Sequence, residues 1–241
     1  MSKKYEMKPE GDLYRIVALR EGPWGHAGTI GGLIESERNL THHDTAWVYG
    51  DAQVYGDAQV YGNARVSGDA RVSGDARVSG DARVYGGAQV YGNAQVSGSA
   101  RVFGNARVYG GAQVYGNAQV SGSARVFGNA RVFGNARVFG NAWVTGNAQV
   151  SGDAQVYGNA RIIHDNTDKT PISIIGSRDS LTLDGDHINI GCVSESIETW
   201  LTGYETIGRE YAYTADQIAE YGKHIQHLAS CAKHKKEKDQ P

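Results

Sequence analysis

The chain has 241 residues, of which 40% are hydrophobic and 33 are glycine, and its formal net charge is −2. This charge gives no overall attraction to nucleic acid, and two cysteines outside CxxC spacing exclude a disulfide framework. Many glycines beside only four prolines indicate regular tight turns and exclude a collagen-like or disordered chain.

The chain begins with charged residues and no apolar run behind them, so we expect no signal peptide. No stretch approaches the roughly 18 apolar residues that a membrane span needs. We therefore expect a soluble, intracellular protein that does not contact a membrane.

Residues 1–45 do not repeat and are predicted to form an N-terminal cap, because a solenoid needs its open end covered. Residues 13–19 read as a strand, and residues 28–36 as a turn that leads into a first coil. His42, His43 and Asp44 are adjacent and would point in different directions on a strand. We therefore predict a solvated cap segment there and no metal site.

Residues 46–163 repeat the unit Ala-x-Val-x-Gly-(Asn/Asp/Gly/Ser), with twenty alanines at every sixth position from Ala46 to Ala160. Ala and Val are two residues apart, so they share one face of a strand and form a narrow core. Gly followed by Asn or Asp is typical of turns. The residues between Ala and Val are Gln, Arg or Trp (Trp47, Trp143), which suit the outside. The period predicts a parallel solenoid of six-residue strand-and-corner units.

Residues 48–53, VYGDAQ, match the pattern aliphatic-x-x-x-small-x, and here the chain resembles the hexapeptide-repeat left-handed β-helix family. The resemblance covers about half of the chain. It implies a mainly β fold: a left-handed parallel β-helix with a triangular cross-section, three hexads to a coil and nearly seven coils.

The pattern degrades after residue 163, and we predict degenerate final coils over residues 164–192. Within them, Asp184-Gly185-Asp186-His187 reads as a tight turn, and Cys192 as a small buried residue. Apolar residues then follow helical spacing, which predicts an αα-hairpin cap over residues 193–232, with a capping box at Thr214-x-x-Gln217. Residues 233–241 are charged, and we predict a disordered tail.

The two ends carry a second resemblance. LYRIVALREG (13–22) and AGTIGGLIESERNL (27–40) precede the hexads, and INIGC (188–192) and SIETWLTGYETIGRE (196–210) follow them. They resemble uncharacterised phage and prophage hexapeptide-repeat proteins with a C-terminal helical hairpin. The resemblance implies a phage or prophage context and the cytoplasm of a bacterial host, and it supplies no reaction.

Many hexapeptide-repeat proteins are acyltransferases and some are zinc carbonic anhydrases, and both use histidines that project from the coils. None of the eight histidines lies between Ala46 and residue 163, and no loop interrupts the twenty hexads. We therefore expect no enzyme, no cofactor and no metal, with an acyltransferase kept as an alternative.

The outward positions of the repeat hold aromatic rings and arginines, which stacked coils turn into ladders. The repeat contains ten arginines and six aspartates and carries +4, and the flanks carry −6. The position after Val holds twelve aromatic residues, including all four phenylalanines. The candidate binding residues are Arg65, Arg83, Arg101, Arg107, Arg125, Arg131, Arg137, Tyr91, Phe103, Tyr109, Phe127, Phe133, Phe139 and Trp143.

Three interpretations of these ladders stay open. In the first, the ladders only raise strand propensity and solubility. They pack against another subunit or a protein partner, since aromatic residues and Arg are enriched at interfaces. Or they bind a flat, anionic, nucleotide-like ligand by stacking and charge.

Residues 84–107 recur identically at 108–131, a duplication of four hexads. Four is not a multiple of three, so the duplication turns everything downstream by about one third of a coil. A precise site spanning both sides would be broken, whereas a spacer or a repetitive surface would tolerate the insertion. The duplication therefore favours a scaffold over a catalytic pocket.

These observations predict a non-enzymatic phage or prophage accessory protein, a rigid binding scaffold that presents its ladders to a host protein or to itself. A homo-oligomer is expected, with a trimer favoured because trimers are common among similar proteins. The first alternative is a counter-defence sponge that sequesters an anionic nucleotide-like ligand.

Overall fold

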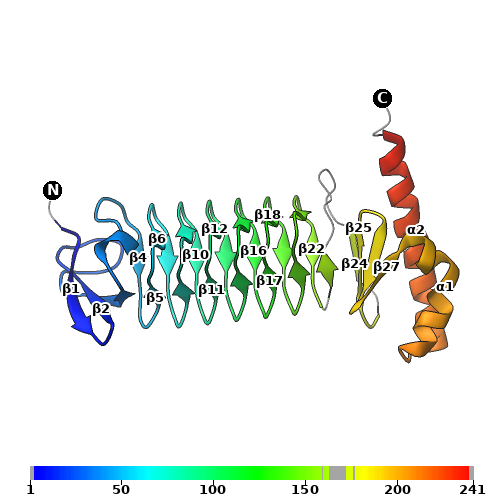
Figure 1. The fold of residues 1–241 in the computed structure, drawn as a ribbon, viewed down its shortest axis with the longest axis horizontal. Coiled ribbons are helices and arrows are strands. Elements are labelled where there is room, and N and C mark those ends of the chain that lie inside the picture. The colour runs from blue at the N-terminus through cyan, green and yellow to red at the C-terminus, as the bar shows by residue number, and fades with distance from the viewer. Residues whose placement is uncertain (1–2, 159, 163–171, 176, 239–241) are drawn as a thin grey trace.

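The structure, a computed structural model, describes residues 3–158, 160–162, 172–175 and 177–238. An N-terminal cap, a straight shaft and a C-terminal cap follow one another along one axis (Figure 1). The shaft is a parallel β-solenoid with three sheets, one on each side of a triangular section. The predicted fold class, a β-solenoid closed by two C-terminal helices, is confirmed.

Each hexad contributes a strand of two residues, and each strand pairs in parallel with the strand 18 residues further on. Gln53 lies opposite Arg71, and Val54 opposite Val72. The backbone N–H of Gln53 donates to the carbonyl of Ala70 at 2.9 Å. Three hexads therefore make one coil, and coils stack at the spacing of hydrogen-bonded strands, about 4.8 Å.

The three sheets of the shaft are called faces 1, 2 and 3. Face 1 contains β5 (Gln53–Val54), β8 (Arg71–Val72), β11 (Gln89–Val90), β14 (Arg107–Val108), β17 (Arg125–Val126), β20 (Trp143–Val144) and β23 (Arg161–Ile162). Face 2 contains β4 (Trp47–Val48), β7 (Arg65–Val66), β10 (Arg83–Val84), β13 (Arg101–Val102), β16 (Gln119–Val120), β19 (Arg137–Val138) and β22 (Gln155–Val156). Face 3 contains β6 (Gln59–Val60), β9 (Arg77–Val78), β12 (Gln95–Val96), β15 (Gln113–Val114), β18 (Arg131–Val132) and β21 (Gln149–Val150).

The core of the shaft consists of the repeated Ala and Val side chains, all fully buried except Ala154, which is partly exposed. The glycine after each outward residue turns the corner. Gly104, for example, has φ +68°, and a Cβ there would lie 3.1 Å from the backbone nitrogen of Gly122 in the next coil. Corner positions thus need glycine both for backbone conformation and for the close approach of the coils.

The N-terminal cap extends face 1. Strands β1 (Tyr5–Glu10) and β2 (Leu13–Ala18) pair antiparallel, and β2 pairs with β3 (Ile30–Ile34). Strand β3 joins β5 in parallel and so begins the stack, as the sequence predicted for this segment. A short 3-10 helix, η1 (Glu37–Asn39), follows before the first hexad.

Trp47 corrects the expectation that tryptophans between Ala and Val face outward. Its ring lies outside the Ala/Val core, yet the cap covers it completely. Trp24 stacks on it at 5.0 Å, and Tyr5 meets it edge-on at 6.2 Å. The rule of alternation places a side chain on one side of a strand; it does not say whether another segment covers that side.

The segment His42–Asp44 is part of this cap, but it is not solvated throughout as predicted, since the side chains of His42 and Asp44 are partly buried. Asp44 accepts hydrogen bonds from the Lys4 ammonium at 3.3 Å and from the Ala46 N–H at 3.1 Å. His42 stacks on Tyr5 at 4.2 Å. Burial lowers the pKa of Lys4, and proximity to Asp44 opposes that shift. These contacts tie the first residues of the chain to the first coil.

Residues 172–175 and 177–192 differ from the predicted degenerate coils, and residues 193–196, predicted as the start of the hairpin, form a strand as well. Strands β24 (Ile172–Ile175), β25 (Ser180–Asp184), β26 (His187–Ile190) and β27 (Val193–Ser196) form an antiparallel sheet. The regular corner glycines stop with the hexads, and Gly185 (φ +63°) reverses the chain in the predicted turn between β25 and β26. Because the chain reverses between successive strands, these strands pair with one another and do not continue the parallel coils. The remainder of the predicted coils, residues 164–171 and 176, lies outside the described residues.

The αα-hairpin is confirmed, with α1 (Ile197–Glu210) and α2 (Ala215–Lys238). The predicted capping box is present, since the Gln217 side chain accepts from the Thr214 N–H at 3.0 Å and the Gln217 N–H donates to the Thr214 hydroxyl at 3.3 Å. The predicted disordered tail is wrong over residues 233–238, which continue α2 as a helix. Residues 239–241 of that tail lie outside the described residues.

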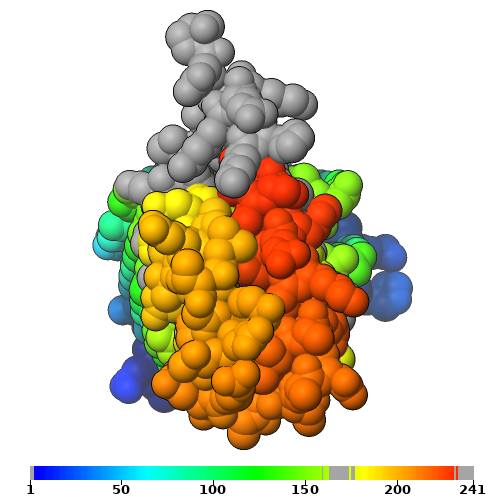
Figure 2. All heavy atoms as spheres, turned by 90° about the vertical axis from the view of Figure 1, so that its right-hand side faces the viewer, coloured from blue at the N-terminus to red at the C-terminus, as the bar shows by residue number. Residues whose placement is uncertain are grey.

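Viewed from its C-terminal end, the molecule shows the helices and the antiparallel sheet covering the end of the shaft (Figure 2). The Ser180 hydroxyl donates to the carbonyl of Tyr157 in the last coils at 3.1 Å. Within the described residues, neither helix combines the length and the apolar character that crossing a bilayer requires.

Candidate functional site

The fourteen candidate binding residues are distributed over all three faces of the shaft. Six lie on face 1 (Arg107, Arg125, Tyr91, Tyr109, Phe127, Trp143), six on face 2 (Arg65, Arg83, Arg101, Arg137, Phe103, Phe139) and two on face 3 (Arg131, Phe133). Face 1 brings its six together over neighbouring strands. It is therefore the best-defined candidate surface.

The aromatic residues of face 1 form a column along the shaft. Tyr91 stacks on Tyr109, and Tyr109 on Phe127, each at 4.9 Å between ring centres and 1° between ring planes. Each ring is half-buried because the next ring covers it. Burial also raises the pKa of the Tyr109 hydroxyl. A planar ligand cannot enter this column without parting the rings, so what the column offers is ring edges.

Trp143 lies beside the end of this column, between two guanidinium groups. Strand pairing puts Arg125 on one side of it and Arg161 on the other. Their central carbons lie 5.0 Å and 4.7 Å from the ring centre, within cation–π range. Phe127 meets Trp143 edge-on at 6.0 Å. We call Arg107, Arg125, Trp143, Arg161 and the Tyr91–Tyr109–Phe127 column the face 1 patch.

Arg161 was not among the candidate binding residues, although the sequence places it among the outward arginines. The signal was present: residues 125, 143 and 161 are 18 apart, which is one coil. The six-residue period alone does not identify such neighbours. The period identifies these neighbours only together with the fact that three hexads make one coil.

Face 2 has a column of another kind. Arg65, Arg83 and Arg101 are in-register neighbours and line a polar groove of about 310 Å³. Asn63, Asp81 and Ser99 form its rim at the corner of the triangle, where the Asn63 amide donates to Asp81 at 3.0 Å. Phe103 stacks on Tyr85 alone, at 4.9 Å. This face lacks a tryptophan between arginines.

The charge of the shaft changes along its axis. Residues 46–81 contain five aspartates and three arginines, whereas residues 82–152 contain six arginines and no acidic residue. Within the described residues, none of the ten shaft arginines forms an ion pair. The middle of the shaft is therefore uniformly positive and lacks internal compensation.

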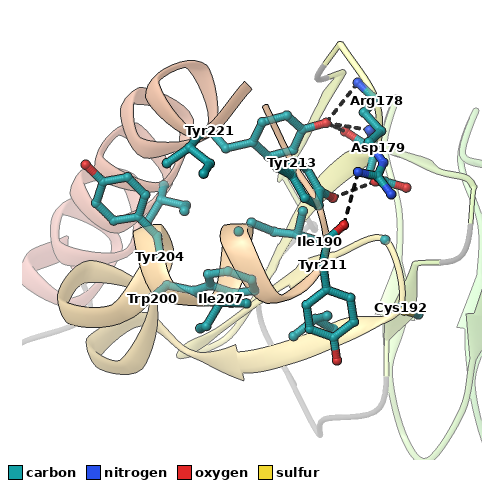
Figure 3. Close-up of a pocket in the computed structure, with 15 residues that line it drawn as sticks. Arg178, Asp179, Ile190, Cys192, Trp200, Tyr204, Ile207, Tyr211, Tyr213 and Tyr221 are labelled. Atoms are coloured by element: carbon teal, nitrogen blue, oxygen red, sulfur yellow. Dashed lines mark hydrogen bonds and ion pairs between the residues drawn. The ribbon is translucent and has the colours of Figure 1, made fainter. Parts of the chain in front are cut away.

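The C-terminal cap contains a pocket that the sequence did not indicate (Figure 3). It has a volume of about 210 Å³ and lies between α1, α2 and the antiparallel sheet. Its wall is mainly aromatic and aliphatic, with Trp200, Tyr204, Tyr213, Tyr221, Ile207 and Ile218 among the lining residues. These residues are scattered between positions 200 and 221, so no motif revealed them.

Hydrogen bonds already engage most polar groups of the pocket wall. Tyr213 donates to the Asp179 carboxylate at 2.5 Å, and Tyr221 to the Asp179 carbonyl at 2.6 Å. The Arg178 guanidinium lies over the Tyr213 ring at 4.5 Å and donates to two carbonyls of the α1–α2 turn, the nearer at 2.9 Å. Burial is the main cause of the raised pKa of Tyr213. These hydrogen bonds anchor the hairpin to the sheet. They leave no acid–base pair among the lining residues free of such bonds.

Cys192 lines this pocket and is exposed, which corrects the expectation of a buried residue. It follows Gly191 (φ +57°), in the turn between β26 and β27, where neither neighbouring strand covers it. In the part of the chain that the structure describes, no cluster of three His, Cys, Asp or Glu side chains is placed to hold a metal ion.

Comparison with known proteins concerns the shaft. Ten stretches match the family model of the YdcK beta solenoid repeat: nine overlap and span residues 58–152, and the tenth spans residues 154–167, together somewhat less than half of the chain. No curated protein matches the chain. The shaft is thus similar to the repeat of a β-solenoid family, and most of both caps lies outside the matched stretches.

Proposed function

We propose that this β-solenoid protein is a non-enzymatic binding scaffold, a rod that presents the face 1 patch to a protein partner. The observation that carries the proposal is the arrangement of Arg125, Trp143 and Arg161 beside a self-stacked aromatic column. Arginine and aromatic side chains are the groups that most often dominate protein interfaces. The shaft also carries neither a histidine nor an interrupting loop between Ala46 and Ile162, which disfavours acyl transfer.

The context proposed for this scaffold is a phage or prophage, with the protein acting in the cytoplasm of the bacterial host. The support is the resemblance of residues 13–40 and 188–210 to phage and prophage proteins of the hexapeptide-repeat type. The left-handed winding and a homo-oligomer, a trimer by preference, belong to the same proposal. Half-buried ring columns on an open surface support the oligomer, because further burial of their edges is favourable.

Affinity purification from the native cell tests the scaffold. We expect the tagged full-length protein to retain a partner that Arg125→Glu loses and Arg101→Glu keeps. The two variants are matched, because the 24-residue duplication gives both arginines the same upstream sequence on different faces. Equal recovery of the partner with both variants would contradict a role for face 1. Acyl transfer from acyl-coenzyme A by the purified protein would contradict the non-enzymatic function.

Two deletions test whether the partner spans the duplication. Removing residues 90–107 takes out one coil and keeps every downstream residue on its face. Removing residues 84–107 takes out four hexads and turns the downstream shaft by one face. Both deletions remove Tyr91 and Arg107, so the comparison is between the two shortened proteins. A partner that needs only Arg125, Trp143 and Arg161 should bind both of them, since these three residues remain stacked in each. Loss of binding in the second deletion alone would show that the partner also contacts the shaft before residue 84.

A further inference from the structure

We propose that the face 1 patch recognises an acidic segment of a protein, whose carboxylates pair with Arg107, Arg125 and Arg161. This inference rests on the proposed function and names the chemistry of the partner. Apolar side chains of the same segment contact the ring edges of the Tyr91–Tyr109–Phe127 column.

Two guanidinium groups of the patch are held against the Trp143 ring. The central guanidinium carbons of Arg125 and Arg161 lie over the Trp143 ring, at 5.0 Å and 4.7 Å from its centre. A guanidinium that stacks on a ring keeps its N–H groups in the plane at its edge, where they can form paired hydrogen bonds to a carboxylate. Stacking on a half-buried tryptophan also reduces the rotamer freedom of both side chains, so less entropy is lost when an anion binds.

The positive charge of the patch is not compensated by acidic residues of the shaft around it. Arg107 lies opposite Arg125 on adjacent strands, and like charges in such positions are destabilising. No acidic residue occurs between positions 82 and 152. An incoming carboxylate therefore relieves a repulsion that the protein itself leaves in place, and it displaces no internal ion pair among the described residues of the patch.

The covered ring faces of the patch favour an acidic protein segment over nucleic acid. Single strands bind protein surfaces largely by stacking bases on exposed aromatic faces. Here the faces of Tyr109 are covered by Tyr91 and Phe127, and those of Trp143 by Arg125 and Arg161. At these two rings only the edges remain, beside the N–H groups of the arginines, and these suit apolar side chains and carboxylates.

The size of the patch sets the length of the segment. From β11 to β23 the face contains five strands, a distance of about 19 Å at the usual strand spacing. An extended chain of about six residues covers this distance. The segment should therefore be short and should carry at least two acidic side chains.

The test is the binding of a fluorescent peptide of about eight residues containing Glu and Leu, measured by anisotropy with the full-length protein. Comparison probes are the same peptide with Gln in place of Glu, and an oligo-dT strand of equal charge. We expect Arg125→Glu to weaken binding of the Glu peptide by about tenfold or more. Arg101→Glu, with the same change of charge on face 2, should weaken it by about twofold at most. Circular dichroism of both variants verifies the fold.

Three outcomes would overturn the inference: failure of the Glu peptide to bind, equal losses in the two variants, or tighter binding of oligo-dT than of the Glu peptide. The last outcome would identify the patch as a nucleic-acid site. The proposed scaffold function fails separately. If Arg125 is needed to retain the cellular partner while the Glu peptide does not bind, the scaffold stands and only the acidic chemistry of the partner is wrong.

Discussion

Residues 84–107 and 108–131 have the same sequence and lie in the same shaft, but their side chains occupy different surroundings. Arg101 and Arg125 are equivalent positions of the two copies. Arg101, on face 2, is exposed and lies between Arg83 and Gln119. Arg125, on face 1, is half-buried over the ring of Trp143.

The difference arises because the copies are 24 residues apart, whereas a coil contains 18. Core positions are equivalent on every face, so Val102 and Val126 are equally buried. Outward positions depend on the residues one coil before and after, and these differ between the copies. In this solenoid, a local sequence therefore specifies the core, while the register of the coils specifies the surface.

The largest effect should come from the corners, where the two copies should behave alike. Gly104 and Gly128 have φ of +68° and +70°, and a Cβ at either would lie about 3 Å from backbone atoms of the next coil. We expect Gly104→Val and Gly128→Val each to lower the free energy of unfolding by about 3 kcal/mol or more. Urea denaturation followed by circular dichroism measures this. A clear difference between the two variants would show that the corners are not equivalent.

A smaller effect should distinguish the aromatic positions. Phe103 stacks only on Tyr85, whereas Phe127 contacts both Tyr109 and Trp143. Because an aromatic pair contributes about 0.5–1.5 kcal/mol, Phe127→Ala should destabilise the protein by about 1 kcal/mol more than Phe103→Ala. The same urea titrations test this. If the losses are equal, the edge contact with Trp143 contributes nothing measurable.

The smallest effect should differ in sign between the copies. Arg125→Gln removes the cation–π contact with Trp143 and also relieves the repulsion from Arg107; the lost contact outweighs the relief, so the free energy of unfolding should fall by about 0.5 kcal/mol. Arg101→Gln removes the repulsion from Arg83 and should raise the free energy of unfolding by roughly a few tenths of a kcal/mol. Thermal unfolding at low and high salt provides the control, since salt screens the repulsion and should abolish the gain from Arg101→Gln. A loss of stability from both substitutions would contradict this reading of the two faces.

Much of the fold was predictable, because each hexad repeats the same pattern of residue types. Alternating Ala and Val predicted the core, and the glycines predicted the corners. The helical spacing after Ile197 and the Thr214–Gln217 box predicted the hairpin. The antiparallel sheet before the helices was not predicted, because the alternating residues of 172–190 indicate strands and contain no information on their direction.

The candidate site was predictable only in part. Sequence reasoning identified the outward arginines and rings and expected them to form ladders. It missed the burial of Trp47 by Trp24 and Tyr5, and it missed the cap pocket around Trp200. Both features depend on contacts between segments that are far apart in the chain.

By itself the sequence determined the period, the Ala/Val core and the places where the chain turns, since these follow from backbone preferences acting within six residues. The tertiary structure decided which outward side chains meet: Arg125 and Arg161 on Trp143, and Phe127 beside them. Those meetings depend on three hexads closing one coil, a geometric result of strand pairing across 18 residues that no single hexad contains.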